Sequence, residues 1–123
     1  DREIKKIDSL IHYTQLDVAE EKVNDLYNLL NQKYHSNKYL EKRALVHLLR
    51  GLLKDKQYQH NNALSIYVEV LKEAEKNNLH RIACHANIHL ALNHSKAGNF
   101  DLAYKYLQEA GKVCEKYQSS SGT

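Results

Sequence analysis

The chain has 123 residues, and its 18 lysines and arginines against 15 aspartates and glutamates give a net charge of +3. Apolar residues at 42% and charged residues at 27% exclude a disordered chain, and no apolar run is long enough to span a membrane. Proline is absent and there are only 4 glycines, which disfavours strands and hairpins. We therefore predict one all-α domain over residues 1–118, followed by a flexible tail at 119–123.

Apolar residues recur at helical spacing along most of the chain. The first predicted helix carries an apolar stripe from Ile4 to Ile11, and Asp17 is predicted to cap the second helix. The polar segment 35–37 separates the second helix from a third, which carries leucines on one face and basic residues on another. The third helix is expected to end before a polar turn at 57–62.

Three further helices follow this turn. The fourth is predicted over about 63–76, the fifth over 79–97 and the sixth over 100–118. Gly98 provides the stop signal between the last two. Short polar turns connect the helices, and no linker or shift in composition divides the chain.

An internal repeat of 40 residues organises these helices. Val23, Ala63 and Ala103 are separated by this step. Two further triplets follow it at the same helical spacing: Tyr27, Tyr67 and Leu107, and Leu30, Val70 and Ala110. The six helices therefore form three copies of one antiparallel helix pair, at about 3–36, 37–78 and 79–118.

Residues 84–117 resemble a tetratricopeptide repeat. The packing positions and the turn of that motif are matched by Leu90, Ala91, Gly98, Asn99, Phe100, Ala103, Tyr106, Leu107 and Ala110. Asn87 and His94 stand where the family has tryptophan and tyrosine, and the spacing exceeds the usual ~34 residues, as in the extended repeats of bacterial regulatory proteins. The resemblance implies a right-handed α-solenoid of three antiparallel helix pairs, in which the first helix of each pair lines a concave groove.

The register of the third helix has two alternatives. A strict 40-residue step pairs Gly51 with Ala91. It also turns His47, Arg50 and Lys54 into a helix interface, where unpaired charges cost several kcal/mol. Sliding the helix by two residues instead lengthens the following turn and buries four leucines, each worth about 1.5–3 kcal/mol: Leu45, Leu48, Leu49 and Leu52. We adopt the slid register.

The resemblance places a basic wall and a partly apolar wall along the groove. The third helix contributes Arg43, Val46, Arg50 and Lys54, and the fifth contributes His85, Ile88, Leu92 and Lys96. Arginine holds carboxylates bidentately, and Ile88 and Leu92 can seat an apolar side chain, so an acidic protein or peptide segment is the expected ligand. The alternative is that the basic residues form a solvated helix face.

Histidines and cysteines raise two further questions. His85 and His89 lie four residues apart, a spacing that can chelate a metal. A site needs three or four ligands and no further ligand is evident, so no metal or cofactor is predicted. Cys84 and Cys114 fall at the same level of two antiparallel helices. Packed helix axes lie about 8–10 Å apart, so two buried thiols are the default. A disulfide is the alternative, and it would indicate an oxidising compartment.

The sequence contains no phosphate-binding loop and no catalytic spacing, so we predict a non-enzymatic module. By analogy with the repeats that it resembles, we expect a protein- or peptide-binding domain with a sensory or regulatory role in a larger bacterial signalling or transcription-regulatory protein. The alternative is homo-oligomerisation through exposed solenoid ends. Nucleic-acid binding ranks last because the net charge is small, and the compartment stays open between cytoplasm and periplasm.

Overall fold

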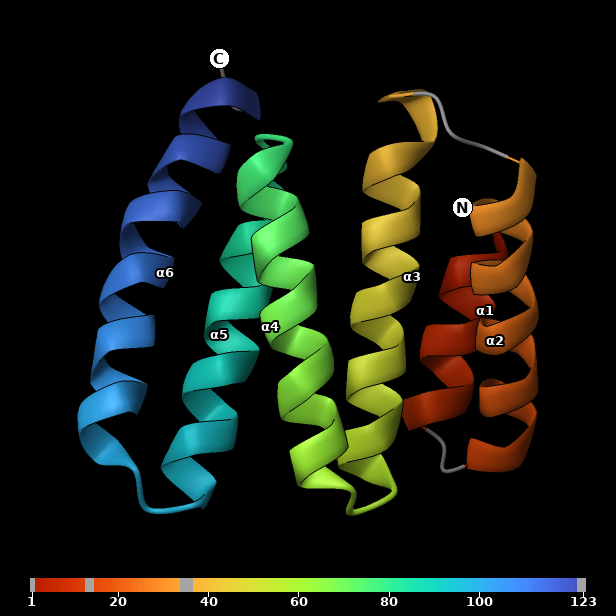
Figure 1. The fold of residues 1–123 in the computed structure, drawn as a ribbon, viewed down its shortest axis with the longest axis horizontal. Helices are drawn as coiled ribbons and strands as arrows, with labels where there is room; N and C mark the ends of the chain where they lie inside the picture. Colours follow the sequence, from red (N-terminus) through yellow and green to blue (C-terminus); the bar gives the residue numbers. More distant parts are fainter. Residues whose placement is uncertain (1, 13–14, 34–36, 122–123) are drawn as a thin grey trace. The chain divides into compact units, whose positions relative to one another are not determined.

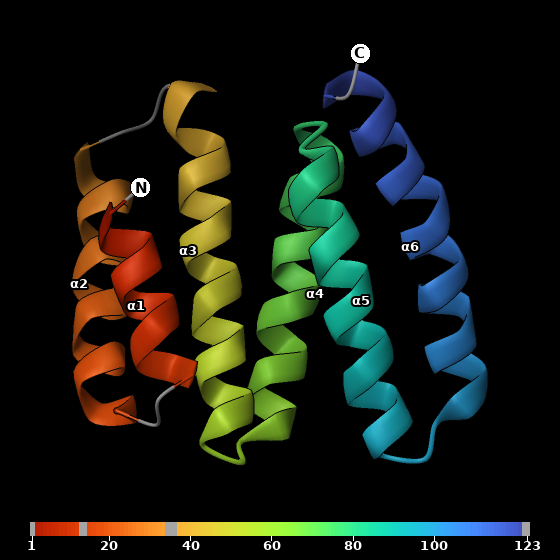
Figure 2. The same cartoon turned by 180° about the vertical axis from the view of Figure 1, so that it is seen from behind.

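The computed structural model describes residues 2–12, 15–33 and 37–121, and within them the chain forms six α-helices and no strand (Figures 1 and 2). The helices are α1 (Arg2–His12), α2 (Leu16–Lys33), α3 (Asn37–Lys56), α4 (His60–Lys76), α5 (His80–Lys96) and α6 (Phe100–Ser121). The predicted all-α fold is confirmed. None of these described helices combines the length and the apolar character that a membrane span requires.

The chain divides by its contacts into two compact units, Asp1–Ile66 and Tyr67–Thr123. We call them unit 1 and unit 2 and describe each by itself. The division falls inside α4, at neither of the repeat boundaries predicted near residues 36 and 78. From the sequence, by contrast, we predict one domain over residues 1–118.

Unit 1 is organised around three mutually packed helices. α1 contacts both α2 and α3, and α2 contacts α3. The apolar stripe predicted from Ile4 to Ile11 turns into this contact, so that Ile7 and Ile11 are buried. They belong to a single core cluster that comprises Ile7, Ile11, Ala19, Val23, Leu30, Val46, Leu49 and Leu53.

In unit 2, α5 and α6 run in opposite directions and pack along their length (Figure 1). The buried side chains on these two helices are mostly small. They include Ala83, Ala86 and Ala91 on α5, and Ala103 and Ala110 on α6. Small side chains allow two helix backbones to approach closely while the interior stays well packed.

The α3–α4 and α5–α6 turns have the same construction. Residues 57–59 and 97–99 separate the helices, and each turn closes with a 2.8 Å bond from its last amide to the carbonyl five residues earlier. The middle residue has a positive φ in both turns, 61° at Tyr58 and 84° at Gly98. Glycine adopts this conformation freely, whereas tyrosine does so at a steric cost of about 1–2 kcal/mol.

The two turns follow a strict step of 40 residues, so the slide adopted for the third helix is wrong. The fourth helix begins at His60, and the turn before it is no longer than its counterpart. Gly51 corresponds to Ala91, and both are buried. His47 corresponds to Asn87, and these two polar residues are also buried, at 6% and 3% exposure.

The first helix pair departs from this step. α2 begins at Leu16, four residues before the position that corresponds to the start of α4. Asp17 therefore lies inside the first turn of α2 and does not cap it, although its negative charge still favours the helix N-terminus. The repeat persists in the burial pattern, since Val23, Ala63 and Ala103 are all buried.

The flexible tail predicted at 119–123 is helical as far as Ser121, and residues 122–123 lie outside the described part of the chain. No glycine or proline occurs between Lys112 and Ser121. The backbone therefore carries no stop signal before Gly122, and the serines continue α6.

Candidate binding surface

The first two residues of the predicted basic wall on α3, Arg43 and Val46, differ in their exposure. Val46 is 0% exposed and belongs to the core cluster of unit 1, so its prediction as an accessible groove residue is wrong. The reason is that α3 packs against both α1 and α2, which widens its buried arc beyond the leucine face. Arg43, one turn earlier, is half-buried.

The remaining basic residues of that wall contact α2 within unit 1. The Arg50 guanidinium lies over the ring of Tyr27, 4.4 Å from its centroid. Lys54 Nζ lies 3.3 Å from Glu20 Oε1, and Gln57 donates to the other oxygen of that carboxylate at 3.2 Å. These intramolecular contacts engage both cations with side chains of α2.

His47 completes a cluster that sequence reasoning missed. Its Nδ1 lies 3.2 Å from the hydroxyl of Tyr27, and the two rings meet edge to face with centroids 4.8 Å apart. We call Tyr27, His47 and Arg50 the polar cluster. The available signal was the spacing of His47, Arg50 and Lys54 on one face of α3, together with a hydroxyl on Tyr27. Because these groups have partners, the strict register avoids the penalty of unpaired buried charge.

The four predicted groove residues of α5 share one accessible face. His85, Ile88, Leu92 and Lys96 follow each other at three- and four-residue intervals, which places them within about 80° of the helix circumference. Leu92 is 50% exposed, His85 and Lys96 are exposed, and Ile88 is half-buried. We call these four residues the α5 face. It has an aliphatic centre with one ionisable side chain at each end.

The two ionisable residues at the ends of the α5 face, His85 and Lys96, differ in charge. Partial burial, and secondly the nearby positive charge of Arg81, lower the pKa of His85 from its ordinary value of 6.5. His85 is therefore neutral at pH 7, while its neighbour Arg81 supplies the positive charge at this end. Lys96 supplies the positive charge at the other end.

His85 and His89, the pair with chelate spacing, have different surroundings: His85 is exposed and His89 is half-buried. The His89 ring stacks on Tyr67 with centroids 5.4 Å apart. Among the described residues, no group of three or more histidines, cysteines, aspartates and glutamates is arranged to hold a metal ion.

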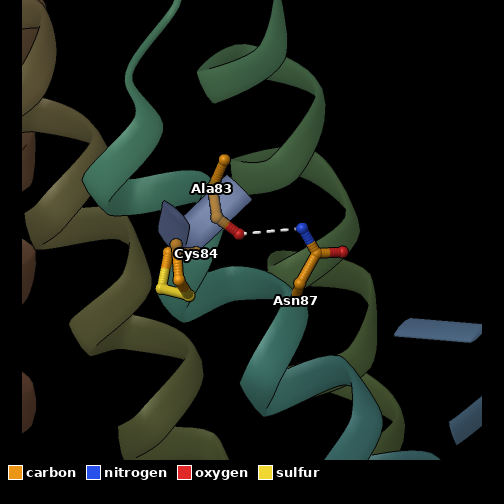
Figure 3. The surroundings of a disulfide bond; sticks show 4 residues. Ala83, Cys84 and Asn87 are labelled. Atoms are coloured by element: carbon orange, nitrogen blue, oxygen red, sulfur yellow. Dashed lines mark hydrogen bonds between the residues drawn. A yellow bond between two sulfur atoms is a disulfide. The ribbon is translucent and has the colours of Figure 1, made fainter. Parts of the chain in front are cut away.

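Cys84 and Cys114 are joined in a disulfide that links α5 to α6 (Figure 3). Their Cα atoms are 5.0 Å apart, within the range that a disulfide requires. Beside the bond, the buried side chain of Asn87 donates to the carbonyl of Ala83 at 2.9 Å (Figure 3). This local bond gives the buried side-chain amide of Asn87 a hydrogen-bond acceptor.

From the sequence we favour two free thiols, because the distance between helix axes is compared with the Cα–Cα distance that a disulfide requires. These two distances are not equivalent. Helix axes lie about 8–10 Å apart, but Cα atoms lie on cylinders of about 2.3 Å radius. Two facing Cα atoms therefore approach to about 4–5 Å, which suits the bond. The buried residues near the two cysteines in sequence include two alanines, Ala83 on α5 and Ala110 on α6, whose small side chains are compatible with close helix packing.

Comparisons of the chain with protein-family models, with curated proteins and with solved structures find no match. The predicted basic wall belongs to unit 1 and the α5 face to unit 2. A groove that unites them therefore stays a prediction, and the α5 face is the accessible surface on which a function can be argued.

Proposed function

We propose that the chain is a non-enzymatic, tetratricopeptide-like module that binds a protein or peptide segment. In this proposal it is the sensory or regulatory part of a larger bacterial signalling or transcription-regulatory protein. The α3–α4 and α5–α6 turns, which repeat at a step of 40 residues, support the repeat architecture. The α5 face supports the binding role.

The observation that carries the proposal is the exposure of Leu92 between cationic ends. A half-exposed leucine beside half-buried Ile88 provides a contact for one apolar side chain of a ligand. Lys96 is exposed at one end of this face and can pair with a carboxylate, and the positive charge of Arg81 lies near His85 at the other end. The ligand that fits best is an acidic segment with a central apolar residue.

The test is a titration of the chain with a fluorescently labelled peptide in which a central leucine is flanked by glutamates. We expect fluorescence anisotropy to show binding, and Leu92→Ala to weaken it by about three- to tenfold because about 1 kcal/mol of apolar contact is lost. Lys96→Glu should weaken it by about two- to fivefold, as expected for an exposed ion pair.

Lys72→Glu is the matched control, because Lys72 is exposed on α4 in unit 2 and the substitution changes the net charge by the same amount. A second peptide with lysines in place of the glutamates should bind more weakly. Equal binding of the two peptides, or an equal loss in Lys72→Glu, would contradict the proposal. Arg50→Glu is unsuitable as a test because Arg50 lies over Tyr27.

A second candidate function is homo-oligomerisation, and exposed apolar side chains on α6 favour it. Nucleic-acid binding has less support than either, because Arg50 and Lys54 have intramolecular partners.

A further inference from the structure

The outer face of α6 carries an apolar stripe without a function so far. Phe100, Tyr104 and Leu107 are 68%, 63% and 53% exposed. Gly111 follows at the same helical spacing, so the four residues share an arc of about 60°. We call them the α6 stripe. Large apolar side chains gathered along one exposed helix face are typical of an interaction surface.

The repeat shows what such a stripe contacts elsewhere in the chain. The positions of α2 that correspond to Phe100 and Leu107 are Glu20 and Tyr27, and both contact α3. On α4 the position that corresponds to Leu107 is Tyr67, which stacks on His89 of α5. In both cases this face contacts the next helix along the chain. On α6 the same face is apolar and exposed.

We propose that the α6 stripe binds the α6 stripe of a second copy of this chain, with the two helices antiparallel. This inference rests on the second candidate function and assigns its interface. A self-complementary surface forms a closed twofold dimer, in which each residue meets its counterpart reciprocally.

Side-chain size supports an antiparallel register. When Phe100 lies opposite Gly111 of the second copy, Tyr104 lies opposite Leu107. A Cβ atom added to Gly111 would meet nothing within 4 Å, so nothing inside the chain requires a glycine there. Glycine in a helix interior costs about 0.5–1 kcal/mol relative to alanine. A phenylalanine ring seated over Gly111 from a second copy explains this choice.

Charge supports the same register. Asp101 and Lys112 are both exposed and project from the same flank of the α6 stripe, at about 90–110° from its centre. The Lys112 ammonium lies 3.5 Å from the exposed carboxylate of Glu109 on the same helix, a surface contact that is weak enough to be exchanged. In a twofold antiparallel pair, like flanks meet. Lys112 of one copy then lies two residues, or about 3 Å along the axis, from Asp101 of the other. Two reciprocal ion pairs result.

The opposite end of the chain does not offer a comparable surface. The exposed positions among the described side chains of α1 are all polar: Arg2, Glu3, Lys5, Lys6 and Ser9. Stacking of the α6 stripe on α1 of another copy would bury these groups against aromatic rings, which is unfavourable. The observations therefore favour closed pairs over open filaments.

The test uses sedimentation equilibrium of the whole chain over about 10 µM to 1 mM, a range that covers weak interfaces of small area. We expect a concentration-dependent monomer–dimer equilibrium. Leu107→Glu should abolish the dimer, and Gly111→Leu should weaken it while the folded chain becomes more heat-stable. Val18→Glu, a matched substitution of an exposed apolar residue on α2, should leave it intact.

The charge pair gives the sharper test. Asp101→Lys and Lys112→Asp should each raise the dissociation constant by about two- to fivefold, and the double variant should restore it to within about twofold. Both positions are exposed, so the variants should fold, and circular dichroism checks this. No restoration in the double variant would overturn the antiparallel register.

A chain that is monomeric throughout would overturn both this inference and the second candidate function. A dimer that persists in Leu107→Glu would overturn only the α6 interface. If the chain stays monomeric but an added amphipathic peptide shifts the NMR signals of α6, the stripe binds a foreign helix and the second copy is excluded. Peptide binding at the α5 face is measured separately, so the first proposed function can fail or stand independently.

Discussion

The α2–α3 contact in unit 1 and the α5–α6 contact in unit 2 stabilise packed helices by different means. In unit 1, the polar cluster and the Lys54–Glu20 pair accompany an aliphatic core. In unit 2, small side chains surround a covalent bond between Cys84 and Cys114. The comparison teaches that packed helices of one chain can be held together by polar side-chain contacts in one unit and by a covalent bond in the other.

Among the changes that test this comparison, reduction of the disulfide should have the largest effect on the stability of the chain. The bond closes a sequence separation of 30 residues, and a loop of that size corresponds to about 3–4 kcal/mol of stabilisation through the unfolded chain. We expect the urea unfolding midpoint to fall when a reductant is added. The double variant Cys84→Ala, Cys114→Ala should start from the lower midpoint and not respond to the reductant. Equal midpoints for the oxidised and reduced chains would show that the bond does not stabilise unit 2.

Substitution of Tyr27 in unit 1 should have the next largest effect on the free energy of unfolding. Tyr27→Phe removes the hydroxyl beside His47 and should reduce the free energy of unfolding by about 1 kcal/mol. Tyr27→Leu, which installs the residue found at position 107, also removes the ring beneath Arg50 and should cost about 1–2 kcal/mol in total.

The difference between these two variants combines the Arg50–Tyr27 contact with the ring contact to His47, and the contribution of Arg50 is the part that depends on its guanidinium. That part should disappear in an Arg50→Gln background, measured by urea unfolding as a double-mutant cycle. A Tyr27→Phe variant as stable as the wild type would mean that the His47 contact contributes nothing to unit 1.

The smallest expected effect is the pH response of His85 in unit 2. Burial, more than the charge of Arg81, lowers its pKa in the folded chain below the ordinary 6.5. The unfolded chain therefore binds this proton at a higher pH than the folded chain does. Stability should be fully retained above about pH 6.5 and should decrease as the pH falls through the pKa of the folded state.

His85→Gln removes this titration. Between about pH 7.5 and pH 5.5, the melting temperature of the variant should fall slightly less than that of the wild type. These pH values lie about one unit on either side of the ordinary histidine pKa. Wild type and variant are measured under the same conditions, so the difference between them reports on the side chain at position 85. A steeper loss in the variant would contradict the lowered pKa of His85.

Sequence reasoning located the helices well because helix formation depends on local spacing. The ends of α5 and the start of α6 lie within a residue of their predicted positions. It was wrong on the start of α4, because the register of the third helix follows the strict 40-residue step, and on the end of α6, because the serines continue that helix. It was also wrong on Val46, since an isolated stripe does not show how many neighbours a helix packs against. The cysteine pair was correctly placed at one level, but the distance between two helix surfaces was overestimated.

The amino-acid sequence by itself determined the all-helical architecture and the 40-residue step, because both follow from the periodic placement of apolar residues along the chain. Only the tertiary structure decided the register of α3 and the partners of His47, Arg50 and Lys54. A buried charge is unfavourable or tolerated according to which group faces it, and that group lies on another helix, 20 to 34 residues away in the chain.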